Sequence, residues 1–221
     1  MQANSTSYFN RQELERISNA VKQAESNTSG EIVPVLASSS DDYDRACFLS
    51  AILFSLLFTI VFSSIWILFP TMFDGLTIAA TLTFLGLQLI GLLVGFYVAT
   101  SMDGIRKAFI PHQVMTRSVF RAAHEAFLQF QVSHTENATG ILIYVSLFER
   151  TVVVLADRSI NRKHDQKTWD EVRDLLVDGL KSDDGANGFI SAISRCGEIL
   201  STDFPIAADD KNELSNELRL V

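Results

Sequence analysis

Two long stretches without a charged residue constrain this chain more than any other feature of its sequence. Residues 47–69 and 76–100 contain no Asp, Glu, Lys or Arg, and 15 of the 23 positions in the first are Leu, Ile, Phe or Val. A helix that crosses a bilayer needs about 20 consecutive apolar residues. Each of those 15 side chains favours insertion by roughly 0.3 to 0.6 kcal/mol, which outweighs the cost of the hydroxyl side chains among them. We predict two transmembrane helices, at 47–69 and 76–100.

The basic residues indicate how such a hairpin is oriented. Arg45 precedes the first span and Arg106, Lys107 and Arg117 follow the second, whereas the connection at 70–75 has no Lys or Arg. Basic residues close to membrane spans favour the cytoplasmic side. We therefore expect a multi-pass protein of a cell membrane with both termini in the cytoplasm, and a tight turn at 70–75.

Small residues along the two spans indicate where the helices approach each other. Ser55, Thr59 and Ser63 repeat every fourth position, and Gly91 and Gly95 form a GxxxG step. Such stripes allow close helix packing in membranes. They favour pairing of the two spans within the hairpin, and an interface between copies of the chain is the alternative.

The polar remainder is predicted to form one α/β domain that the hairpin interrupts. Residues 1–46 and 101–200 are expected to fold together into a layered domain with a small mixed sheet, because neither part has enough apolar faces for a core of its own. Residues 201–221 are expected to be a polar, mostly irregular tail. The predicted helices are 10–27, 113–131, one that Asp165 caps and one that includes 189–200, and the predicted strands are 31–37, 141–148 and 151–156.

Local signals add detail to three of these elements. Asn10 and Glu13 have the spacing of a capping box at a helix start. Pro34 lies within an apolar strand and cannot donate a backbone hydrogen bond, so that strand is expected near a sheet edge. Glu149 and Arg150 separate two β-branched runs and are predicted to form a two-residue hairpin turn.

Composition narrows the range of partners. The net charge is −8, and the basic residues are scattered among more numerous acids, which argues against a nucleic-acid partner, because phosphate binding requires clustered Lys and Arg. Cys47 and Cys196 are expected to be free thiols, since the chain lacks the CxxC spacing of redox and zinc sites.

Several motifs, spread over nearly the whole chain in the same order, resemble those of the TPM-domain family, in particular its membrane-embedded bacterial branch. They are TSGEIVPV at 28–35, SDDYDRA at 40–46, TGILIYVSLFER at 139–150, ADRSI at 156–160, and Phe204-Pro205 with Asp209, Asp210, Asn212, Glu213 and Leu214. The resemblance implies an α/β sandwich on a bacterial inner membrane. It also implies a role like that of chloroplast relatives, which look like helpers in assembling and repairing membrane complexes. Phosphatase activity is attributed to one branch, but Asp157-Arg158-Ser159 stands where soluble relatives carry a glycine-rich step.

Charged residues at strand ends are the best candidates for a site, because α/β sheets bind ligands there. If the first two strands are parallel, Glu31 and Asp157 meet at one end of the sheet with Arg158, close to Glu136 and Asn137. The two carboxylates are the candidate metal ligands, for Ca²⁺ or Mg²⁺, and Arg158 is a candidate contact for an anion or a partner. A surface ion-pair cluster is the alternative. At the opposite end, Glu149 and Arg150 are candidate partner contacts.

Two functions of different classes remain at this point. One is a non-catalytic membrane protein whose cytoplasmic domain binds or helps to maintain other membrane proteins, either as a monomer or as an oligomer. The other is a metal-assisted phosphatase. The chain has no phosphate-binding cysteine loop, Walker loop, HExxH or EF-hand spacing, so no catalytic residue is predicted and the first function is preferred.

Overall fold

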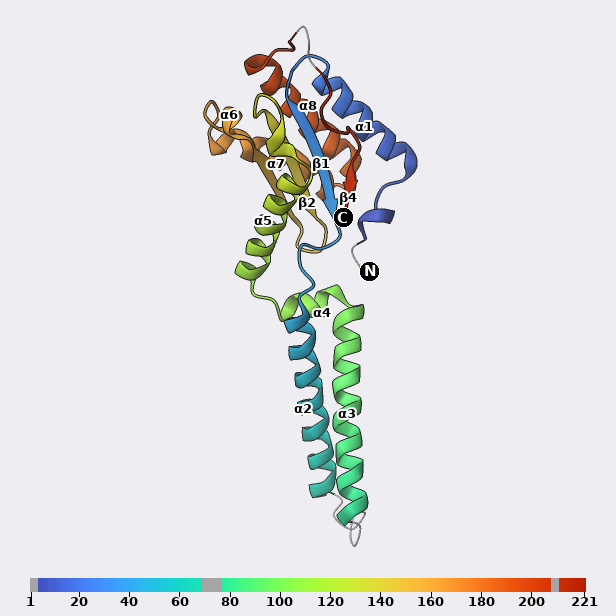
Figure 1. The fold of residues 1–221 in the computed structure, drawn as a ribbon. Coiled ribbons are helices and arrows are strands. Elements are labelled where there is room, and N and C mark those ends of the chain that lie inside the picture. Colours follow the sequence, from blue (N-terminus) through green and yellow to red (C-terminus); the bar gives the residue numbers. More distant parts are fainter. Residues whose placement is uncertain (1–3, 69–76, 208–210) are drawn as a thin grey trace. The chain divides into compact units, whose positions relative to one another are not determined.

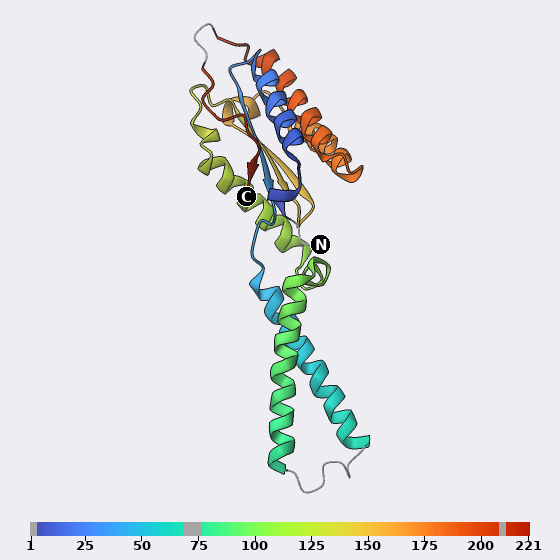
Figure 2. The ribbon, with the colours of Figure 1, turned by 90° about the vertical axis from the view of Figure 1, so that its right-hand side faces the viewer.

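The computed structural model of this chain describes residues 4–68, 77–207 and 211–221 (Figures 1 and 2). The described residues form two compact units: a hairpin unit within 42–114, and an α/β unit made of 4–41 and 115–221. The elements are η1 (Ser5–Ser7), α1 (Arg11–Glu25), β1 (Glu31–Ala37), α2 (Asp44–Leu68), α3 (Thr77–Ser101), α4 (Asp103–Ala108), α5 (His112–Gln129), η3 (Val132–His134), β2 (Gly140–Ser146), β3 (Thr151–Ala156), α6 (Arg158–Asn161), α7 (Gln166–Lys181), α8 (Gly185–Asp203) and β4 (Arg219–Leu220).

A four-stranded mixed sheet, in the order β3-β2-β1-β4, organises the α/β unit. β1 is parallel to both β2 and β4, and β2 is antiparallel to β3. β1 comes before the apolar helices in the sequence and the other strands come after them. One sheet is therefore built from segments on both sides of the hairpin.

Helices cover both faces of this sheet (Figure 2). On one face, Ile17 of α1, Trp169 of α7 and Phe189 of α8 belong to the same buried cluster as the strand residues Ile32 and Ile141. On the other face, α5 packs through Val119, Ala123 and Ala126 against side chains of β1 and β2. Alternate residues of a strand point to opposite faces of the sheet. Since both faces are covered, β1 and β2 are buried along their whole length.

β1, which contains Pro34, lies next to the edge strand β4, which agrees with the expected position near a sheet edge. β1 has β2 on one side and β4 on the other. The Ser38 N–H donates to the Val221 carbonyl, and the Val221 N–H donates to the Leu36 carbonyl. Residues two positions apart in a strand direct their backbone groups to the same side, so the nitrogen of Pro34 also faces the side of β4. The two-residue β4 pairs only with Val35 and Leu36. A proline is tolerated there because the short partner strand does not extend to it.

The helix starts follow the predicted capping. The Asn10 side chain accepts from the Glu13 N–H at 3.0 Å, and the Glu13 carboxylate accepts from the Asn10 N–H at 2.8 Å. This reciprocal pair confirms the capping box of α1. Asp165 caps α7 by accepting from the Thr168 N–H at 3.3 Å, also as predicted.

The turn between β2 and β3 is longer than predicted. The last pair of the ladder is Ser146 with Thr151, so residues 147–150 form a four-residue turn. The N–H groups of Leu147 and Phe148 bond instead to the carbonyls of Ala37 and Ser38, and Phe148 is buried. Residues 147 and 148 therefore stay hydrogen-bonded to the end of β1 and the residue after it, although the pairing with β3 has already ended at Ser146.

The C-terminal segment is mostly irregular, as predicted, but it is not a free tail, because it is attached to the α/β unit. Helix α8 continues to Asp203, Pro205 forms a bridge with Thr28, and Arg219–Leu220 is a strand of the sheet. Leu218 is buried in the main core cluster. A two-residue strand is too short to produce a recognisable alternation of apolar residues, so only the sheet reveals it.

The hairpin unit contains two helices that are long and apolar enough to cross a membrane, α2 and α3. Their bounds lie within a few residues of the predicted spans, while the predicted turn at 70–75 lies outside the described residues. A Cβ placed on Gly91 would lie 2.9 Å from Ser55 Cα, and one on Gly95 would lie 2.8 Å from Ala51 Cα. The GxxxG step thus serves pairing within the hairpin.

Polar side chains add hydrogen bonds between α2 and α3. The Ser55 hydroxyl donates to the Gln88 side chain, whose amide donates in turn to the Thr59 hydroxyl. Ser50 donates to the Gly95 carbonyl at 3.1 Å. In a lipid environment these bonds satisfy groups that would otherwise lack partners.

Candidate functional site

The structure brings Glu31 and Asp157 to the same end of the sheet. Glu31 pairs with Gly140 across the parallel β1–β2 ladder, and the Asp157 N–H donates to the Gly140 carbonyl at 2.9 Å. The two residues therefore lie on either side of one β2 residue. This arrangement follows from the parallel pairing of β1 with β2.

The Glu31 carboxylate connects three segments at this end. Glu31 is 5% exposed, and its Oε1 accepts from the Glu213 N–H at 2.9 Å. The Glu213 carboxylate accepts in turn from the Glu136 N–H at 3.2 Å. Glu31 and Glu213 thus tie the C-terminal segment to the start of β1 and to the loop before β2.

Asp157 serves as the N-cap of α6. Its Oδ1 accepts from the Arg158 N–H at 2.6 Å, while its Oδ2 is buried and has no hydrogen-bond partner among the described residues. The Arg158 side chain is exposed and forms no ion pair within the described part of the chain.

No three His, Cys, Asp or Glu side chains in the described residues are grouped closely enough to hold a metal ion. Asp209 and Asp210, which follow Pro205 in the family-like motif, lie outside the described residues. Ca²⁺ or Mg²⁺ binding by Glu31 and Asp157 therefore stays a prediction.

At the opposite end of the sheet, Glu149 and Arg150 have different environments. The Glu149 carboxylate accepts from the Ser40 N–H at 3.0 Å and from the Ser146 hydroxyl. Arg150 is exposed and has a φ of 54°. Glu149 thus holds the segment after β1 against the β2–β3 turn, while Arg150 is accessible to a partner. Burial raises the pKa of the neighbouring Tyr144.

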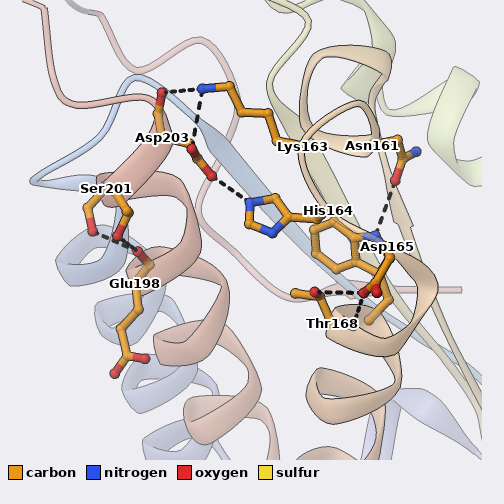
Figure 3. Close-up of polar contacts among 10 residues, drawn as sticks. Asn161, Lys163, His164, Asp165, Thr168, Glu198, Ser201 and Asp203 are labelled. Atoms are coloured by element: carbon orange, nitrogen blue, oxygen red, sulfur yellow. Dashed lines mark hydrogen bonds and ion pairs between the residues drawn. The ribbon is translucent and has the colours of Figure 1, made fainter.

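A cluster that no sequence motif indicates joins the α6–α7 segment to the end of α8 (Figure 3). His164 Nε2 lies 2.5 Å from Asp203 Oδ2, and Lys163 Nζ lies 3.3 Å from Asp203 Oδ1 and 4.5 Å from the Phe204 ring centroid. Asp203 ends α8, where the helix dipole disfavours a negative charge. The neighbouring cationic and hydrogen-bonding groups offset that cost. The hydrogen bond from His164, followed by the bond and charge of Lys163, lowers the pKa of Asp203.

We expect Asp203→Asn to lower the free energy of unfolding by about 1 kcal/mol at neutral pH, because it removes the charge that accepts from His164 and Lys163. An aspartate whose pKa is lower in the folded state stabilises the fold above its unfolded pKa, and this contribution is lost as the pH falls through its folded pKa. The difference between wild type and variant should therefore shrink as the pH is lowered from about 5 to about 2.

Trp169, which belongs to the α/β unit and hydrogen-bonds to Asn161, provides the fluorescence signal for this measurement in a Trp66→Phe background. Glu217→Gln is the matched control, because Glu217 is exposed. A stability difference for Asp203→Asn that stays constant across this pH range would contradict the prediction.

The comparisons with known proteins show a related fold. No family model and no curated protein matches the chain. Among solved structures, the chain is similar to the NMR structure of the BA42 protein from the psychrophilic bacterium Bizionia argentinensis, with a TM-score of 0.58 and 20% identity over 96% of this chain and 95% of that one. At this identity the likeness concerns the fold alone.

Proposed function

We propose that this chain is an integral membrane protein whose α2–α3 hairpin crosses the bilayer twice. The observation that carries the proposal is the surface of these helices. Only 17% of the most apolar window of each helix is buried, although a core helix of a soluble protein would be mostly buried. The exposed side chains include Leu53, Leu57, Ile60, Leu82, Leu89 and Leu93. In water they would form an apolar patch far larger than soluble monomers normally expose.

Residues near the helix ends support the same proposal. Trp66 lies close to the end of α2, and Tyr97, which is 71% exposed, lies close to the end of α3. Trp and Tyr are enriched where a bilayer meets water. Arg106 and Lys107 follow on α4. These residues are suited to the two boundaries of a membrane.

Both termini are proposed to lie in the cytoplasm, on the inner membrane of a bacterium. Fusions of a reporter that is active only in the periplasm should be inactive after Arg45 and at Val221 and active within residues 71–75, because the basic residues flank only the outer ends of the hairpin. Cytoplasmic reporter fusions at the same three positions should give the reciprocal pattern. Periplasmic activity at Val221 would overturn this topology.

The α/β unit is proposed to be a TPM-like domain that binds or helps to maintain other membrane proteins. Two observations support a binding role. The carboxylates of Glu31 and Glu149 accept backbone hydrogen bonds inside the unit, whereas Arg158 and Arg150 are exposed. The two carboxylates therefore stabilise the unit itself. The two exposed arginines are accessible for contacts with a partner.

Site-specific photo-crosslinking tests this role in the intact membrane. A crosslinker at Arg150 or at Arg158 should capture defined membrane proteins, whereas one at Phe189, which is buried, should not. Hydrolysis of a generic phosphomonoester by the purified chain, dependent on Mg²⁺ or Ca²⁺ and abolished by Glu31→Gln with Asp157→Asn, would replace the binding role by the metal-assisted phosphatase.

A further inference from the structure

A group of exposed cations lies on the segment that connects β3 to α7. Residues 158–167 contain four Lys or Arg and one acid, Asp165, in a chain whose net charge is −8. Arg158, Arg162 and Lys167 are all exposed, and these three residues are called the basic cluster below. The fourth cation, Lys163, is paired with Asp203.

The acids near the basic cluster are bonded to other groups, including Asp170 and Glu171 of α7, which pair with Arg173 and Arg195. Asp157 accepts from the Arg158 N–H, and Asp165 accepts from the Thr168 N–H, so both cap helix starts. Asp203 is engaged by Lys163 and His164. In the described residues, no side chain of the basic cluster forms an ion pair.

In the isolated chain, electrostatic interactions disfavour positive charge at the positions of these three cations. The Arg162 N–H donates to the Arg158 carbonyl at 3.3 Å, so the two arginines lie one helical turn apart on the same face, where like charges repel each other. Lys167 is in the first turn of α7, a 16-residue helix, whose positive dipole end disfavours a cation. A bound anion would relieve both effects.

We propose that the basic cluster binds an acidic segment of a partner protein. The two arginines suit acidic side chains, since a guanidinium can hold a carboxylate with two parallel hydrogen bonds. Three cations on an acidic chain are too few for the extended phosphate contacts of a nucleic acid. This inference rests on the proposed binding role and names the chemistry of the partner.

Binding of a fluorescent oligo-glutamate peptide to the full chain in neutral detergent, measured by anisotropy, tests the inference. The triple variant Arg158→Gln, Arg162→Gln, Lys167→Gln should bind about tenfold more weakly than wild type, since it loses three exposed ion pairs. The control variant Lys22→Gln, Arg117→Gln, Lys211→Gln removes the same charge from exposed positions elsewhere. It should bind within about twofold of wild type, because screening limits the reach of surface charges.

Equal affinities of the two triple variants would overturn the inference, as would equal binding of oligo-glutamine and oligo-glutamate by wild type. Tighter binding of an RNA oligonucleotide than of oligo-glutamate would overturn it in favour of nucleic acid. Failure of the proposed function has a different signature: wild type would then capture no membrane protein by photo-crosslinking, whatever its affinity for the peptide.

Discussion

Replacing Gly179 by alanine is expected to lower the free energy of unfolding of the α/β unit by about 2 kcal/mol. A Cβ at this position would lie 2.4 Å from the Cα and 2.8 Å from the N of Gly188, which belongs to the backbone of the neighbouring helix. Backbone cannot rotate away as a side chain can, so α7 and α8 would have to separate, at a cost of about 3 kcal/mol. The higher helix propensity of alanine returns about 1 kcal/mol.

Asp178→Ala is the matched control for this substitution, because Asp178 is the neighbouring position on α7 and its side chain is exposed. Its effect should stay within about 0.5 kcal/mol. Denaturant unfolding followed by Trp169 fluorescence in the Trp66→Phe background measures both variants. A Gly179→Ala variant as stable as wild type would show that the two helices are not in close contact.

Leucine at both Gly91 and Gly95 is expected to separate α2 from α3 in the hairpin unit. Their Cβ atoms would lie under 3 Å from the α2 backbone at Ser55 and Ala51, so the helices would have to move apart. The hydrogen bonds of Gln88 to Ser55 and Thr59 would be lost with the close approach. Packing of small residues is a main source of helix association in membranes, where the hydrophobic effect is weak.

Cys47 is a built-in probe of this change, because it is buried in the hairpin unit. In a Cys196→Ala background, alkylation of Cys47 should be at least about tenfold faster in the double leucine variant, which corresponds to about 1.4 kcal/mol of destabilisation. Gly86→Leu is the control on the same helix, since a Cβ there meets no atom within 4 Å. Equal alkylation rates in all three proteins would contradict the prediction.

Local signals were sufficient for most elements of this fold. The capping pair of Asn10 and Glu13, the Asp165 cap, the buried strand at 31–37 and the two uncharged stretches each depend on residues within one or two turns of each other, or on one continuous run. The physical cause of each element therefore lies inside a short window of the sequence. Such elements can be predicted without knowledge of the rest of the fold.

Contacts between distant residues required the tertiary structure. His164 meets Asp203 across 39 positions, and Glu31 meets Glu213 across 182, while no periodic pattern links either pair. The second strand beside Pro34 is only two residues long and comes from the C-terminal segment. Packing of the whole α/β unit decides these pairings.

Two membrane-length helices and a mixed α/β unit can be predicted from the sequence alone, because hydrophobicity and capping act locally along the chain. The fold assigns the charged side chains to their different environments. It turns Glu31 and Glu149 toward backbone N–H groups and leaves Arg150, Arg158 and Arg162 exposed. A side chain's role depends on which groups the fold brings within hydrogen-bonding distance, and that distance is a property of the packed molecule.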